Sequence, residues 1–163
     1  TMDTPRTPFI PRTPLTPGAR AASWTAQVLV AVILGQTLFF KFTGAAESRA
    51  LFEALGAEPW GRIGTGVAEL AAVALLLLPA TAAYGALLAL GLMAGTIGSH
   101  LLVIGIEHEG DGGLLFGMAV AAFAASALVA WLRRGAIVAR LRSVRWSRGS
   151  RGSRGLSGNR APE

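Results

Sequence analysis

Four ionisable side chains, Lys41, Arg62, Glu69 and His100, stand in or beside long apolar runs of this chain. A charge deep in a membrane span costs on the order of 3 kcal/mol, so each needs a partner or a proton. Arg62 precedes Glu69 by seven residues, which puts both on one helix face. A buried glutamate beside a histidine can relay protons or hydrogen-bond a quinone carbonyl. The structural alternative is that Lys41 or Arg62 pairs with Glu69 while His100 bonds a backbone carbonyl, only to fix helix packing.

The elements that must position these residues are apolar helices. Runs without a formal charge cover Ala21–Phe40, Leu70–Ile106 and Gly112–Leu132. Because a bilayer core about 30 Å thick needs roughly 20 apolar residues of helix, the central run is long enough for two spans, and Pro79 marks the turn between them. The sequence predicts spans at Ser23–Phe42, Trp60–Leu78, Ala83–Ile104 and Gly113–Leu132. The predicted fold class is all-α, an integral membrane four-helix bundle.

Composition supports one membrane domain and limits its chemistry. Hydrophobic residues make up 52% of the 163 residues and charged residues only 15%. The chain has no cysteine, which excludes disulfide exchange, thiolate metal sites and cysteine nucleophiles. Any redox role must therefore use a cofactor or a partner protein.

The basic residues predict the orientation. Arg6, Arg12 and Arg20 precede the first predicted span and nine arginines follow the last. Since positive segments stay inside, both termini are expected in the cytoplasm, and the acidic connections at Thr43–Pro59 and Glu107–Asp111 outside. The net charge of +6 then reflects topology and gives no reason to expect nucleic-acid binding. In this orientation Gln36 or Lys41, together with Glu69 and His100, falls in the outer half of the bilayer, where these side chains can converge.

The two tails differ in composition from the membrane domain at residues 22–134. Residues 1–21 are predicted to be a disordered Pro/Thr-rich tail, and residues 135–163 a basic Arg/Ser/Gly-rich tail. Ile137, Leu141 and Val144 follow helical spacing there, so this tail either lays a short basic helix on the inner leaflet or only fixes orientation. The excess of arginine over lysine is typical of a GC-rich bacterial gene, which favours the bacterial inner membrane.

The first run also allows a second interpretation. It could be a signal peptide, with Arg20 as its positive region and Gly44-Ala45-Ala46 as its cleavage site. The run is longer than the roughly 7–15 residue apolar core of such peptides, which favours a retained span.

Near the end of the first predicted span, Gln36 and Lys41 are turned apart by about 140° at 100° per residue, so only one of them is expected to face the bundle.

Two connections carry weaker signals. Ser48–Leu55 has the pattern of a short amphipathic helix in the outer interface, where it can cover the polar pocket. Glu107, His108, Glu109 and Asp111 have residue types that bind divalent ions, yet short acidic loops with neighbouring turn glycines are usually solvated, so no metal is predicted.

Small residues repeat every four positions in the last two spans. The repeats are Gly91 and Gly95, and then Gly113, Gly117, Ala121 and Ala125. They allow close approach of helices, either within the chain or against a second copy.

Several short segments carry a family resemblance. They are Leu38–Gly44, Pro59–Arg62 leading into Gly66–Leu70, the span with His100, and Asp111–Phe116. Over residues 22–134 they resemble the DoxX-like family of small four-helix membrane proteins (DoxX/DoxD). The resemblance implies relatives such as the small subunit of a thiosulfate:quinone oxidoreductase and proteins of membrane redox and oxidative-stress complexes. If a quinone-facing role carries over, the matching positions are Lys41, Arg62, Glu69 and His100.

Two functional hypotheses follow. In the first, the chain is a quinone-proximal accessory subunit of a membrane redox complex, in which a partner carries the electron-transfer cofactor; the sequence has no haem pair, flavin motif or cysteine cluster of its own. In the second, it is a non-catalytic scaffold or a small-solute or proton permease. We expect an accessory membrane subunit rather than a stand-alone enzyme. Under both hypotheses the protein is in contact with the lipid bilayer.

Overall fold

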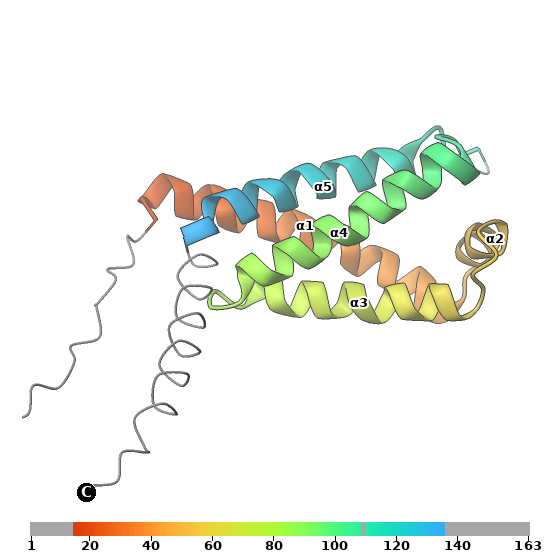
Figure 1. Cartoon of the computed structure of the whole chain (residues 1–163), viewed down its shortest axis with the longest axis horizontal. Coiled ribbons are helices and arrows are strands. Elements are labelled where there is room, and N and C mark those ends of the chain that lie inside the picture. Colours follow the sequence, from red (N-terminus) through yellow and green to blue (C-terminus); the bar gives the residue numbers. More distant parts are fainter. Residues whose placement is uncertain (1–14, 109, 136–163) are drawn as a thin grey trace, which may run out of the picture. The chain divides into compact units, whose positions relative to one another are not determined.

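Helices account for nearly all of the part of the chain that the computed structural model describes, residues 15–108 and 110–135 (Figure 1). They are α1 (Pro17–Thr43), α2 (Ala46–Ala54), α3 (Trp60–Leu77), α4 (Ala82–Ser99), a π-helical turn η1 (His100–Ile104) that continues α4, and α5 (Leu114–Leu132). No strand occurs in these two ranges, so the all-α prediction is confirmed. The predicted basic helix at Ile137, Leu141 and Val144 lies outside the described residues.

Four segments are long and apolar enough to cross a membrane: α1, α3, α4 together with η1, and α5. This confirms the four predicted spans, with one boundary corrected. α1 begins at Pro17 rather than Ser23, because the hydroxyl of Thr16 accepts the backbone N–H of Ala19 at 3.3 Å and proline is favoured at the first helical position. Residues 17–21, predicted as tail, therefore belong to the first helix.

The connection after α1 is a tight turn made possible by Gly44. This residue adopts φ 66°, in the left-handed region that favours glycine. The N–H of Ala45 then donates to the carbonyl oxygen of Phe40 at 3.1 Å, and α1 ends at Thr43, directly before Gly44. The amphipathic helix predicted at Ser48–Leu55 is present as α2, and Phe52 is its buried residue.

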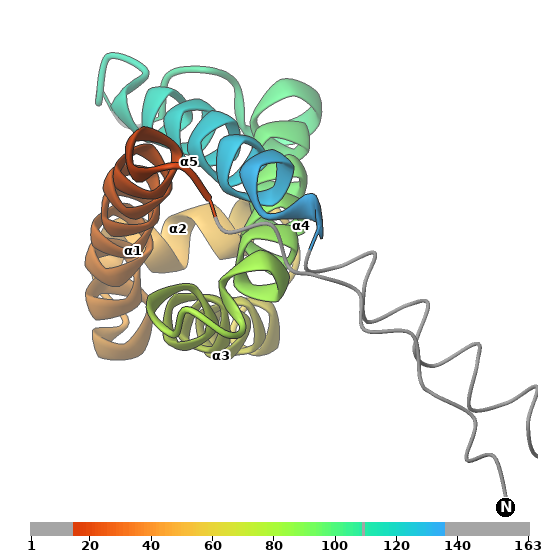
Figure 2. The same ribbon diagram turned by 90° about the vertical axis from the view of Figure 1, so that its left-hand side faces the viewer.

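The four long helices pack around a common core within Leu15–Arg133. Viewed along the bundle, α1, α3, α4 and α5 follow one another around it, and α2 lies across one end (Figure 2). We call this the α2 end; η1 and the loop before α5 also lie there. The opposite end, which carries the turn between α3 and α4, is called the turn end. The middle of the core is apolar and fully buried, with Val30, Leu34, Ala72, Leu76, Ala86, Ala89 and Ala122 each at 0% exposure.

One helix pair packs backbone to backbone. A Cβ atom added to Gly85 on α4 would lie 2.5 Å from the nitrogen of Leu76 and 2.9 Å from the carbonyl oxygen of Ala72, both on α3. Such distances leave no room for a side chain, so Gly85 fixes the close approach of α3 and α4 beside their turn.

The predicted small-residue repeats behave differently. Gly91, Gly95 and Gly117 are exposed, and an added Cβ on any of them meets open space within the chain. Among the repeat positions it is Ala125 that is buried in the core. Apart from Ala125, the exposed positions of these repeats therefore face outward and do not mediate the packing of the four helices.

The outer surface of the bundle is apolar. Large side chains on all four long helices are exposed, among them Val32, Phe39, Val67, Leu87 and Leu128. A soluble protein rarely exposes such continuous apolar surface, whereas a lipid bilayer matches it. The surface and the helix lengths together indicate a multi-pass membrane protein in contact with lipid.

Candidate functional site

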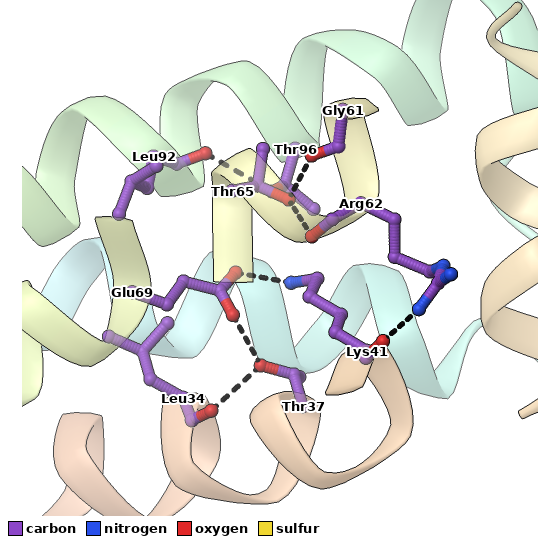
Figure 3. A network of polar contacts seen from close by, with 9 residues as sticks. All are labelled: Leu34, Thr37, Lys41, Gly61, Arg62, Thr65, Glu69, Leu92 and Thr96. Carbon is purple, nitrogen blue, oxygen red and sulfur yellow. Dashed lines mark hydrogen bonds and ion pairs between the residues drawn. The ribbon is translucent and has the colours of Figure 1, made fainter. Parts of the chain in front are cut away.

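A buried ion pair joins α1 and α3 near the α2 end of the bundle (Figure 3). The ammonium group of Lys41 contacts Oε1 of Glu69, and the hydroxyl of Thr37 lies 2.9 Å from Oε2 of the same carboxylate. The side chain of Glu69 is 2% exposed and that of Lys41 is 13% exposed. Both carboxylate oxygens of Glu69 thus have a partner from α1, which is how the bundle accommodates a charge at this depth.

Helical spacing explains why these groups meet. Thr37 and Lys41 are four residues apart and share the face of α1 that carries buried Leu34 and Leu38. On α3, buried Arg62, Gly66 and Glu69 share one face, as their spacing predicts. An added Cβ at Gly66 would lie 3.7 Å from the Cβ of Lys41, so the small residue lets the lysine stem lie along α3.

Arg62 extends the cluster toward the α2 end. Its Nε lies 2.9 Å from both carboxylate oxygens of Glu58, and its Nη1 donates to the backbone carbonyl of Lys41. That carbonyl lies in the last turn of α1, where carbonyl groups lack helical partners, because the N–H of Ala45 turns to Phe40 instead. The hydrogen bond from Arg62 lowers the pKa of Glu58, which precedes α3. Arg62 therefore closes the end of α1 and does not itself bond Glu69.

The hydroxyl of Thr37 links the charge of Glu69 to the backbone of α1. It lies 2.8 Å from the carbonyl oxygen of Leu34 and 2.9 Å from Oε2 of Glu69, and it has one hydrogen to donate. That hydrogen can go either to the carboxylate of Glu69 or to the carbonyl of Leu34, and rotation of the hydroxyl switches between the two acceptors.

His100 is buried at the same end but in a different environment. It begins the π-helical turn η1, its Nδ1 lies 2.8 Å from the carbonyl oxygen of Gly105, and its ring meets that of Phe116 edge to face at 5.8 Å. Since a carbonyl only accepts, Nδ1 carries the hydrogen. The described residues include no hydrogen bond between His100 and Glu69. His100 therefore makes the hydrogen bond to a backbone carbonyl that was expected if its role is only to fix helix packing.

The remaining predicted positions are readily located. Gln36 is exposed on the outer surface of α1 and Lys41 faces the bundle, so only one of the two faces inward, as predicted. Thr37 was not predicted, although its four-residue spacing from Lys41 was visible in the sequence.

The acidic loop before α5 has a structural explanation. The carboxylate of Asp111 accepts backbone N–H groups of His108, Gly113 and Leu115, each at 2.9 Å. These bonds lower the pKa of Asp111 to about 2, and they satisfy amide groups at the start of α5. Outside residue 109, which is not described, the residues of this loop include no group of three metal-ligating side chains.

Comparison with known proteins leaves the family open. No family model, no curated protein and no solved structure matches the chain. The fold and the site define a multi-pass helical membrane protein with a buried lysine–glutamate pair between its first and third helices.

Proposed function

We propose that the chain is a DoxX-like membrane protein that acts as a quinone-proximal accessory subunit of a membrane redox complex. The observation that carries the proposal is the Lys41–Glu69–Thr37 cluster, which keeps an ionisable carboxylate and two hydrogen-bond donors buried between α1 and α3. Buried ionisable groups inside a membrane are costly, and they commonly mark proton or substrate sites.

The ammonium of Lys41 fits a quinone head group. The carbonyl oxygens of a quinone accept hydrogen bonds, and the contact with Glu69 takes one of the three hydrogens of this ammonium, while Thr37 directs its single hydrogen to Glu69 or Leu34. A quinone, when bound, would supply two-electron, two-proton redox chemistry, with the electrons exchanged by a partner subunit. Glu69 would hold or release a proton, Thr37 would follow its ionisation by rotating, and Arg62 would keep the end of α1 closed.

The proposal includes an orientation and a location. The arginine-rich tails favour cytoplasmic termini, and with that orientation the cluster would lie in the outer half of a bacterial inner membrane. The outward-facing Gly91 and Gly95 on α4 offer a close-packing face for a partner subunit or a second copy.

A scaffold role is the second candidate, and a specific observation favours it. Lys41, Glu69, Arg62 and His100 each have a hydrogen-bond partner inside the bundle, so each can serve helix packing alone. A permease has less support, because the fully buried apolar side chains in the middle of the core provide no polar step for a proton or solute.

Purification from the native membrane into lipid nanodiscs, followed by native mass spectrometry, tests the proposal. We expect wild type to retain quinone in about a one-to-one ratio and to co-purify with redox subunits. Glu69→Gln removes the ionisable group and should release the quinone. Thr37→Val removes the hydroxyl without changing charge and should weaken retention. Glu53→Gln changes an exposed acid on α2 and serves as the control.

The outcomes separate the two candidates. Loss of quinone from Glu69→Gln, with helicity and monodispersity intact, supports the redox role. Absence of quinone from intact wild type, whatever the variants do, refutes it and leaves the scaffold role.

A further inference from the structure

A second polar cluster, separate from the proposed quinone site, lies in the core at the turn end of the bundle. Ser23 and Gln27 on α1 and Ser126 on α5 are each 0% exposed, although all three are polar. Arg133, directly after α5, borders this cluster. Its Nε donates to Oγ of Ser23 at 2.9 Å, and its Nη1 donates to the carbonyl oxygen of Pro79 in the α3–α4 turn at 2.9 Å.

The hydrogen bonds of Gln27 fix the direction of its amide. Nε2 donates to the carbonyl oxygen of Ser23 at 2.7 Å and to its Oγ at 2.8 Å. Because a backbone carbonyl only accepts, the NH₂ group must face Ser23, and Oε1 must point away from it. Oε1 of Gln27 is buried and has no hydrogen-bond partner among the described residues.

Ser126 differs from several other hydroxyl residues of the long helices, because its hydroxyl is buried and has no partner within the described residues. The hydroxyls of Thr43, Thr65, Thr96 and Ser99 each bond a carbonyl oxygen four residues earlier in their own helix. The hydroxyl of Ser126 makes no such bond within the described residues, although it is fully buried. Its oxygen is therefore available to a group in the core.

Gln27 and Ser126 lie on the same side of the contact between Ser23 and Arg133, toward the middle of the core. α1 and α5 are antiparallel neighbours, and the contact between Ser23 and Arg133 sets their register. Gln27 is one turn beyond Ser23 on α1, and Ser126 is two turns before Arg133 on α5, so both move from that contact toward the middle of the core.

We propose that one ordered water molecule binds between α1 and α5 and bridges Oε1 of Gln27 and Oγ of Ser126. A water can donate one hydrogen bond to the amide oxygen of Gln27 and can form a second with the hydroxyl of Ser126, either as donor or as acceptor. An unpaired buried polar atom is costly, and buried waters commonly satisfy such atoms with two to four hydrogen bonds. Oγ of Ser23 already accepts from both Gln27 and Arg133, whereas Oγ of Ser126 has no partner within the described residues, so Ser126 is the second end of the proposed bridge.

Water-selected nuclear magnetic resonance of the full chain in nanodiscs tests this site. The reporter is a cross peak between water and the side-chain amide protons of Gln27. We expect the peak in wild type and its loss in Ser126→Ala, together with a lower midpoint of unfolding. Ser99→Ala is the matched control, because the hydroxyl of Ser99 already bonds its own helix; it should leave the peak unchanged.

Each other outcome overturns the proposal. A midpoint that rises in Ser126→Ala, without a water peak in wild type, means that the two atoms are simply unpaired. A midpoint that falls, again without a water peak, means that Ser126 bonds Gln27 directly. A water peak that survives Ser126→Ala unchanged places the water elsewhere.

Discussion

Removing one partner of the Lys41–Glu69 pair is expected to destabilise the bundle strongly. Glu69 is 2% exposed, so Lys41→Met leaves a carboxylate buried with only Thr37 to stabilise it. Breaking a buried ion pair costs about 3–5 kcal/mol, and the Coulomb energy of two charges about 4 Å apart at an effective dielectric constant near 20 is of the same size. Glu69→Gln should cost a similar amount, because it leaves the ammonium of Lys41 without a counter-charge.

A double-mutant cycle measures this coupling directly. Wild type, Lys41→Met, Glu69→Gln and the double variant are unfolded reversibly in mixed detergent micelles, and their free energies of unfolding are compared. We expect the double variant to be more stable than the sum of the single effects predicts, by about 2–3 kcal/mol, since it carries no unpaired charge. Effects that add to within about 0.5 kcal/mol would show that the pair does not couple and refute the reasoning. Glu53→Gln, on the exposed side of α2, should stay within about 0.5 kcal/mol of wild type.

Three further predictions concern packing, acid stability and orientation. Gly85→Ala should lower the free energy of unfolding by about 2–3 kcal/mol, because its Cβ would meet the backbone of α3. Gly91→Ala is the control: its Cβ would face open space, so this substitution should be neutral or stabilising. Equal effects of the two substitutions in the same unfolding assay would contradict the close α3–α4 contact. The pKa of Asp111 is lowered to about 2 from 3.8, so its stabilising contribution is complete above pH 3.8 and is lost as the pH falls toward 2. Asp111→Asn should flatten this acid limb of the thermal unfolding midpoint, and an unchanged limb would exclude Asp111 as its source. Because the chain has no cysteine, Ala54→Cys and Ala80→Cys can be labelled individually; an impermeant thiol reagent should reach the first in intact cells and the second only after permeabilisation, and the reverse would invert the proposed topology.

The fold was largely predictable because membrane insertion imposes a strong constraint. Spans need about 20 apolar residues, so the uncharged runs set the number of helices, and Pro79 marked the turn between α3 and α4. The start of α1 was harder to predict, because Thr16 and Pro17 form a cap among residues that also resemble a disordered tail. Which side of a helix faces the core was predictable only where polar residues share that side. The spacing of the glycines therefore did not indicate that Gly85, rather than a residue of the repeats, makes the close contact between helices.

The site was predictable in part for a related reason. Charges buried in a membrane need partners, so Glu69 could be expected to pair with Lys41 or Arg62, and the structure shows Lys41 as the partner. The partner of His100 depends on the π-helical turn η1, which brings the carbonyl of Gly105 to its ring and leaves no trace in residue spacing. Uncharged polar residues such as Thr37, Gln27 and Ser126 are tolerated in apolar runs, so they gave only a weak signal of their burial.

The apolar middle of the core separates the two polar clusters and limits what each can do. Gln27 and Thr37 are ten residues apart on α1, about 15 Å along the helix, and fully buried Val30 and Leu34 lie between them. The small side chains of α3 and α4 at this level, such as Ala72 and Ala89, are also fully buried and apolar. The described residues therefore provide no hydrogen-bonded route from Glu69 to Gln27, so the proposed quinone role would confine any proton exchange to the α2 end.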